Sequence, residues 1–180
     1  MRYAKWLAAA SLSVAVVGSA FAAETRRDNY GDWSFVCNKA EVAEGETMES
    51  CTLYQVASVI PGGENAAEDA KPQQLLMTRI GYVPENELPL MVLTTPIGVL
   101  LKPGLLIEVE GHPNVRIPYD RCDSGGCVAS VAMEPEFVDA LMKGAEAKVT
   151  FMDPQRRPIA LPVSLKGVSK GMNELDKSRQ

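Results

Sequence analysis

The chain has 180 residues, of which 18 are basic and 23 acidic, and its formal net charge is −5. This balance lacks the basic footprint that phosphate binding requires, so it argues against nucleic-acid binding and against attachment to an anionic membrane surface.

The first 22 residues have the composition of a secretory signal peptide. Arg2 and Lys5 precede an apolar run at 6–17, and the pattern AFA at 20–22 offers small residues for cleavage. A membrane-spanning helix needs ~20 apolar residues, so a retained anchor is the less favoured alternative. Cleavage after 22 leaves 158 residues with 16 basic and 23 acidic side chains, a net charge of −7. We expect residues 23–180 to form one domain, in the periplasm or at the cell surface, without a membrane span.

The first half of the mature chain predicts β-structure after a polar leader at 23–32. Strand-like runs with alternating or continuous apolar residues occur at 33–37, 51–56, 73–81 and 88–94. Trp33 and Phe35 share one face of the first run and are expected in the core. The segment 61–72 is framed by prolines and lacks apolar periodicity, so it predicts a long exposed loop.

The second half continues this pattern, with turns at 96–98 and 102–104. Further strands are expected at 106–110, 115–119, 128–133, 147–152 and 159–165, where 115–119 and 128–133 form the arms of a hairpin. A helix is expected at 134–144, which has a proline near its start and a glycine at its end, and a short closing helix at 168–175. The sequence therefore predicts an all-β sandwich with one or two short helices.

Four cysteines in an exported chain form an even set, which an oxidising compartment holds as disulfides. Three connectivities are open. Pairing of Cys37 with Cys51 and of Cys122 with Cys127 is the most economical, because each pair brackets a polar or glycine-containing segment that can turn back on itself. The crossed pairings remain as alternatives.

The string DSGG at 123–126 also surrounds the nucleophilic serine of trypsin-like proteases. Such a serine needs a general base, an acid that orients the base, and donors that face the oxyanion. The single histidine of the sequence, His112, lies in a Gly-His-Pro turn, and Cys122 stands where the protease motif has glycine. We therefore predict that Ser124 is not catalytic and that His112 is a turn residue.

The same loop could serve redox chemistry through Cys122 and Cys127. Reactive thiolates usually lie in a Cys-x-x-Cys motif at a helix start, where the thiol pKa is lowered. Here four residues separate the two cysteines between predicted strands, and Arg121 is the only flanking cation. A structural hairpin disulfide is the preferred interpretation.

Metal binding and carboxylate catalysis have weaker support. The cysteine spacings do not match the usual zinc-ligand rhythm, and export favours oxidation of thiols over zinc binding. Glu108 and Glu110 are expected on one exposed strand face, and Glu134 and Glu136 complement a helix start. We predict no catalytic residue, no metal and no cofactor. The pair at 156–157, two arginines at a hairpin tip, could contact an acidic partner.

Several motifs together resemble the invasion-associated locus B family of exported bacterial proteins. They are GDWSFVC at 31–37, PLMVLTTPIGVLLKPGLLIEVEG at 89–111, IPYDRCDSGGCVASVAM at 117–133 and PVSLKGVSKGMNEL at 162–175. The resemblance implies an immunoglobulin-like β-sandwich, a periplasmic or surface location, and disulfides at the cysteine positions. It also implies a link to bacterial entry into host cells, including erythrocytes. It transfers no catalytic residue.

The leading hypothesis is thus an exported, non-enzymatic β-sandwich that binds a protein or envelope component, including the host-cell surface, and contributes to invasion or adhesion. Binding is expected through loops or an edge strand. Two alternatives stay open: a periplasmic redox or hydrolytic enzyme that uses the Cys122–Cys127 loop, and an envelope-assembly or chaperone-like factor.

Overall fold

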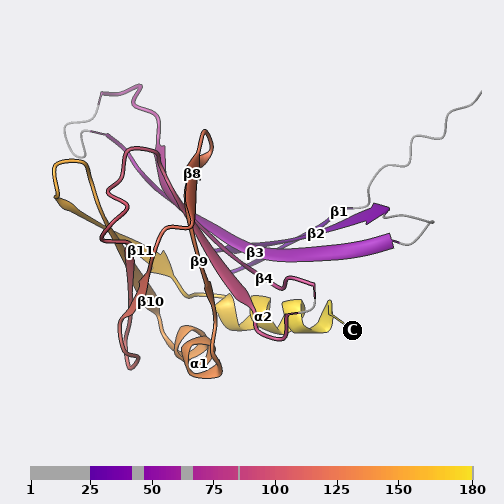
Figure 1. Cartoon of the computed structure of the whole chain (residues 1–180). Helices are drawn as coiled ribbons and strands as arrows, with labels where there is room; N and C mark the ends of the chain where they lie inside the picture. Colours follow the sequence, from indigo (N-terminus) through magenta and orange to yellow (C-terminus); the bar gives the residue numbers. More distant parts are fainter. Residues whose placement is uncertain (1–24, 42–46, 62–66, 85, 180) are drawn as a thin grey trace, which may run out of the picture.

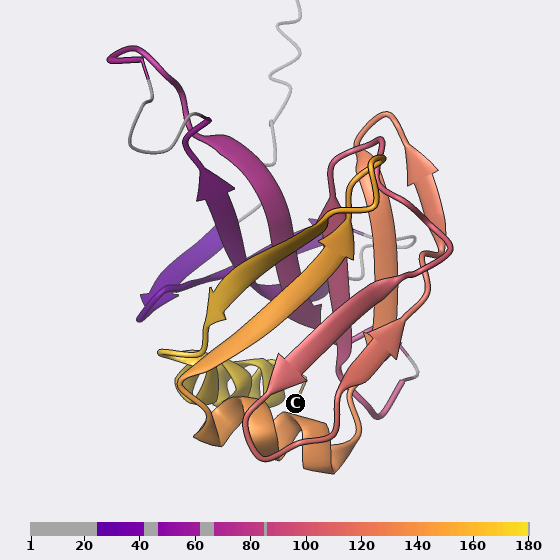
Figure 2. The ribbon, with the colours of Figure 1, turned by 90° about the vertical axis from the view of Figure 1, so that its left-hand side faces the viewer.

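The structure is a computed structural model that describes residues 25–41, 47–61, 67–84 and 86–179. Two antiparallel sheets face each other, which confirms the predicted all-β sandwich (Figures 1 and 2). The seven-stranded sheet has the spatial order β1 (Thr25–Tyr30), β2 (Trp33–Glu41), β3 (Thr47–Val59), β4 (Gln73–Gly81), β5 (Leu90–Thr95), β9 (Gly126–Ala132) and β8 (Arg121–Asp123). The four-stranded sheet has the order β11 (Pro158–Ser164), β10 (Glu146–Met152), β6 (Leu105–Val109) and β7 (Val115–Ile117).

The core lies between the facing surfaces of the two sheets. Side chains of β5, β6 and β10 alternate between buried and more exposed positions, as the period of two in the sequence predicts. Trp33 and Phe35 of β2 are buried as expected, and the largest fully buried side chains come from both sheets. They include Leu53, Leu76, Ile80, Leu93, Leu105, Ile107, Ile117 and Phe151.

Two helices cover one end of the sandwich, as Figure 2 shows. Helix α1 (Pro135–Lys143) begins at the expected proline and buries Phe137 and Leu141. Helix α2 (Val168–Lys177) buries an apolar face that includes Met172 and Leu175. Neither helix is long and apolar enough to cross a membrane, and the described residues contain no other candidate.

A hydrogen-bond network around Ser164 joins the two sheets. The Trp33 indole donates to the Ser164 carbonyl at 2.7 Å. The Gln55 side-chain amide donates to the same carbonyl at 3.1 Å and accepts the Ser164 N–H at 3.0 Å, so it pairs with this residue as a neighbouring strand would. The Ser164 hydroxyl donates to Asp32 at 2.6 Å. The end of β11 is thereby tied to β3 and to the β1–β2 turn.

Two predictions about the strands were wrong. The polar leader contains strand β1, whose side chains are mostly exposed because it forms the edge of the large sheet. The segment 115–119 is not an arm of the hairpin around DSGG: β7 pairs with β6 in the other sheet, and β8 pairs with β9 instead. The predicted signal peptide and residues 62–66 of the predicted long loop lie outside the described residues.

Candidate binding surfaces

The DSGG segment forms the turn of the β8–β9 hairpin. The Asp123 carboxylate accepts the N–H of Gly125 at 2.8 Å and the Arg121 guanidinium at 3.4 Å, so it shapes the turn. Gly126 has φ 133°, and a side chain there would approach the Thr95 carbonyl oxygen to 2.5 Å. Glycine is needed because β5 passes this close to the hairpin.

Ser124 lies far from the single histidine of the chain. It lies in the β8–β9 turn, whereas His112 follows β6 at the opposite end of the small sheet, next to α1. The His112 ring packs against Phe137, with ring centroids 5.2 Å apart, and its Nδ1 lies 2.7 Å from the Pro113 carbonyl oxygen. The two residues that a serine protease would bring together are therefore separated by the length of the sandwich.

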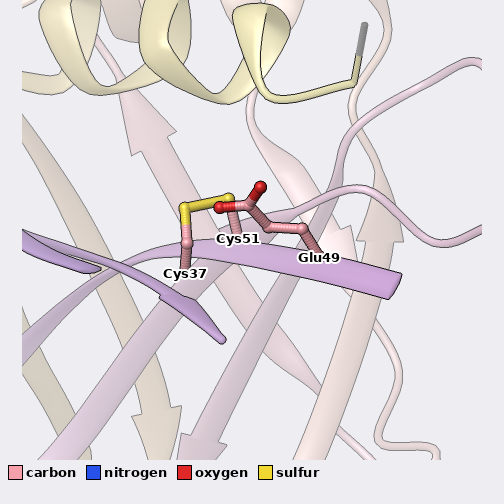
Figure 3. Close-up of side chains that lie close together, drawn as sticks. All are labelled: Cys37, Glu49 and Cys51. Carbon is pink, nitrogen blue, oxygen red and sulfur yellow. A yellow bond between two sulfur atoms is a disulfide. The ribbon is translucent and has the colours of Figure 1, made fainter. Parts of the chain in front are cut away.

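Both disulfides have the pairing that the sequence favoured. Each joins residues directly opposite each other on neighbouring strands: Cys37 with Cys51 across β2 and β3, and Cys122 with Cys127 across β8 and β9. Figure 3 shows the Glu49 carboxylate beside the Cys37–Cys51 bridge, with all three side chains close enough to share an ion. The two sulfur atoms are bonded to each other, so they do not provide thiolate ligands for a metal.

The acidic residues considered for catalysis lie at an ion-paired position or at exposed positions. Glu108 is half-buried and makes an ion pair of 2.8 Å with Lys148, while Glu110 follows the end of β6 and is exposed. Glu134 and Glu136 flank the start of α1 and are exposed. These carboxylates match ordinary surface and helix-start positions.

Three connections meet at the end of the sandwich opposite the helices: β5–β6 (96–104), β8–β9 (124–125) and β10–β11 (153–157). We call them the loop end. Strands β5, β8 and β10 all finish here, so the three connections lie at one end of the sandwich (Figure 2). The β5–β6 connection is held in place, since Leu100 N–H donates to the Met152 carbonyl at 3.0 Å and Arg116 donates to the Pro103 carbonyl at 2.7 Å.

Two aliphatic side chains project from the β5–β6 connection. Ile97 is 66% exposed and Leu101 51% exposed, while Val99 between them packs against the core. Lys102 and Arg156 are exposed nearby on the loop end, and within the described residues neither makes an ion pair. The loop end thus presents apolar side chains and unpaired cations on a chain whose net charge is negative.

Asp153 shapes the β10–β11 turn that carries Arg156. Its carboxylate accepts the N–H groups of Gln155 and Arg157 at 2.9 and 2.8 Å and the Arg157 side chain at 2.7 Å. Burial acts to raise the pKa of Asp153, but these hydrogen bonds and the charge of Arg157 outweigh it, so the pKa lies below its usual value. Arg156 has φ 64°, a left-handed conformation that the turn maintains.

A hollow of about 600 Å³ lies beside the first residues of β3, at the end of the strand away from the loop end. One wall is formed by residues 48–51, the other by residues 82–84 and 86–87 of the β4–β5 connection, and Ser178 and Arg179 close its base. We call it the arm groove. Met48 is 46% exposed and Val83 44% exposed, so the groove contains the large exposed apolar side chains of this end of the sheet.

The base of the arm groove is fixed by contacts between α2 and the β4–β5 connection. The Tyr82 hydroxyl donates to Asp176. The Arg179 guanidinium lies 4.0 Å above the Tyr82 ring and donates to the carbonyl oxygens of Glu87 and Asn86 at 3.3 and 3.5 Å. Burial, together with the hydrogen bond to Asp176, raises the pKa of Tyr82. These contacts hold Tyr82 and Arg179 in place at the base of the groove.

Comparison with known proteins identifies the family. The model of the invasion associated locus B (IalB) protein family matches residues 33–176. The chain belongs to the IalB family. It is 24% identical over 170 residues to invasion protein B homologues of Brucella abortus strain 2308 and of biovar 1 strain 9-941, with 93% of this chain and 89% of each relative covered. The crystal structure of invasion associated protein B from Bartonella henselae superimposes with a TM-score of 0.65 at 20% identity, covering 86% of this chain and 97% of that one.

The IalB match spans both disulfides and both surfaces, except for Ser178 and Arg179 at the base of the groove. Sequence reasoning did identify the loops as the place to look for binding, and it singled out Arg156 and Arg157. It missed Ile97 and Leu101, whose apolar neighbours make the segment look like core. It also missed the arm groove, because the sequence placed the start of the second strand at 51, whereas β3 begins at Thr47.

Proposed function

We propose that this IalB-family chain is an exported, non-enzymatic protein of the bacterial envelope that binds a protein partner through its loop end, and that this binding contributes to host-cell invasion. The exposure of Ile97 and Leu101 on a tethered connection carries the proposal. Loops held by a rigid scaffold commonly bind partners. Exposed apolar side chains rimmed by polar ones are typical of interaction sites.

The charges of the loop end define the expected partner. Lys102 and Arg156 form no ion pair with any residue that the structure describes, and Arg121 and Arg157 are exposed beside the acids that they contact. The partner should therefore offer an apolar patch bordered by carboxylates. The export part of the proposal rests on the signal-like segment at 1–22 and on two disulfides, which persist in oxidising compartments.

Binding of the purified protein to host-cell membranes and to envelope fractions tests the proposal. Covering one aliphatic side chain contributes about 1.5–3 kcal/mol, so Ile97→Asp should weaken binding by roughly ten- to hundredfold. Ile97→Leu should retain it. Val83→Asp introduces the same charge at a similarly exposed apolar site in the arm groove and should leave this binding unchanged. Equal binding by wild type and Ile97→Asp would reject the loop end as the site.

A redox role for the β8–β9 hairpin is the second candidate, because Cys122 is exposed. Against it, Arg121 contacts Asp123, and neither of the two described helices starts beside Cys122 or Cys127. We expect both disulfides to survive glutathione-range potentials, as measured by intact mass after thiol alkylation. Selective alkylation of Cys122 or Cys127 under mild reduction would instead support the redox role.

An assembly or chaperone-like role would appear as altered outer-membrane composition after deletion of the gene, with host-cell binding retained.

A further inference from the structure

Strand β3 extends past its neighbour β4 and leaves part of its edge open. Pairing with β4 ends at Thr52, opposite Gly81, whereas pairing with β2 continues to Thr47. Residues 47–51 therefore have β2 on one side, and among the described residues no strand pairs with them on the other. Figure 1 shows this arm of β1, β2 and β3 projecting beyond the rest of the sheet.

The backbone of Glu49 points toward the open side of the arm. The Cα atoms of Cys37 and Cys51 are 4.0 Å apart, the close spacing of a pair that exchanges no backbone hydrogen bonds across β2 and β3. The N–H and C=O of Cys51 are thus directed away from β2. Because these directions alternate along a strand, Glu49, two residues earlier, presents its N–H and C=O to the same open side.

The arm groove lies along this open edge. Its wall contains the four consecutive residues 48–51, and neighbouring strand residues project to opposite faces, so the wall is the edge of the strand and not one of its faces. The opposite wall is the β4–β5 connection with Tyr82, Val83 and Pro84. The groove therefore combines backbone groups that no described strand pairs with and exposed apolar side chains.

We propose that the arm groove binds an extended peptide segment of a partner protein, which adds a strand to the open edge of β3. Backbone groups of Glu49 would pair with the peptide, and the exposed side chains of Met48 and Val83 would cover its apolar residues. This surface is separate from the loop end, and the proposal does not depend on the function proposed for the loop end.

Charge defines the peptide further. Glu49 and Glu87 are exposed at the groove, and within the described residues their carboxylates make no ion pair. Among the described residues that line the groove, the cation is Arg179, which is engaged by the Tyr82 ring and by backbone carbonyls. The groove thus favours a peptide in which basic and apolar residues alternate. A second copy of this chain is disfavoured, since symmetric pairing of two β3 edges would bring the two Glu49 side chains together.

The probe is the peptide acetyl-TVKVKVT-amide, labelled with a fluorophore and titrated with the full mature protein. Two further peptides carry N-methyl groups on alternate residues, one set in each phase. In a bound strand, the N–H groups of every second residue point to β3 and those of the residues between them point away. The peptide methylated on the first set should therefore lose at least tenfold in affinity, while the other should bind like the parent. Hydrogen exchange should show protection of the Glu49 amide when the parent peptide is added.

Protein variants provide an independent test. Glu49→Pro removes the N–H that faces the groove and should weaken the parent peptide at least tenfold, whereas Glu49→Gln keeps the backbone and should cause a smaller, salt-sensitive loss. Val83→Asp should also weaken binding, and Ile97→Asp at the loop end should not. Thermal unfolding checks that Glu49→Pro is folded; if it is not, the methylated peptides and Val83→Asp decide the question.

Three results would overturn the proposal. Equal affinity of the two methylated peptides would show that no strand pairing occurs. Unchanged binding by a folded Glu49→Pro variant and by Val83→Asp would place the peptide elsewhere. Protection of the Glu49 amide that rises with protein concentration in the absence of peptide would assign the open edge to a second copy of the chain.

Discussion

Replacement of Gly167 by alanine should destabilise the protein by about 2–4 kcal/mol. Gly167 precedes α2 with φ 96°, and an alanine Cβ would overlap the carbonyl group of Tyr30 and lie 2.8 Å from the Gly31 nitrogen. The left-handed backbone costs alanine about 1–2 kcal/mol, partly offset by about 0.4–1 kcal/mol from the reduced entropy of the unfolded chain. Overlap with a backbone that cannot rotate away adds about 1–3 kcal/mol.

Gly98→Ala is a matched control for the overlap. Gly98 has φ 92°, nearly the same as Gly167, but a Cβ there meets nothing within 4 Å. Its cost should be about 1 kcal/mol or less, because only the backbone conformation is penalised. Urea unfolding measures both variants. A difference of 2 kcal/mol corresponds to about 4–8 °C in Tm for a chain of this size. Equal losses would refute the close approach of the β1–β2 turn to the start of α2.

Replacing Cys37 and Cys51 together by serine should lower the free energy of unfolding by about 3 kcal/mol, as expected for a disulfide between cysteines 14 positions apart in the sequence. Urea unfolding measures this loss, and an unchanged free energy of unfolding would show that the bridge does not stabilise the fold. Gln55→Ala removes both hydrogen bonds that join β3 to the end of β11 and should cost about 1–3 kcal/mol. Gln55→Glu should not recover this loss, because it keeps the acceptor for the Ser164 N–H but turns an oxygen without a proton toward the carbonyl oxygens of Ser164 and Asp32. Asp153→Asn should lower Tm near neutral pH, because the ionised Asp153 carboxylate stabilises the folded protein. The pKa of Asp153 is lowered by folding, so this stabilisation is fully present above the ordinary pKa of 3.8 and is lost as the pH falls through the folded pKa. The Tm difference between wild type and Asp153→Asn should therefore shrink in acid, and a difference that stays constant with pH would contradict the ionised role of the carboxylate.

Local patterns were sufficient to predict most strands and both helices. Alternation along 73–81 and the proline that starts α1 act through the backbone of the segment itself, so no knowledge of the rest of the fold was needed. Strand β1 was not predicted, because five of its six residues are at least partly exposed and only Tyr30 is buried. An edge strand can form without an apolar face when backbone hydrogen bonds join it to a neighbouring strand, which for β1 is β2.

The errors and omissions at the sites have a non-local origin. Val115 and Ile117 do alternate as strand residues do, but only tertiary contacts decide that β7 joins β6 and not the hairpin that follows it. Ile97 and Leu101 lie in a segment rich in aliphatic residues, and their exposure depends on Val99 taking the inward position. The arm groove depends on β4 being shorter than β3, which is a property of the pairing between two distant segments.

The two proposed surfaces should act independently because they lie at opposite ends of β3. At about 3.3 Å per residue, the eleven steps between Met48 and Val59 span about 36 Å, several times the Debye length of ~8 Å at physiological salt. A charge introduced at Ile97 will therefore be screened before it affects the arm groove, and the converse holds for Val83. Between the surfaces, the contacts of Gln55 and Trp33 with Ser164 fix β3 to the small sheet. In the double variant Ile97→Asp/Val83→Asp, loop-end binding should therefore fall as in Ile97→Asp alone and peptide binding as in Val83→Asp alone. A further loss of either activity beyond about 0.5 kcal/mol would show that the two surfaces are coupled.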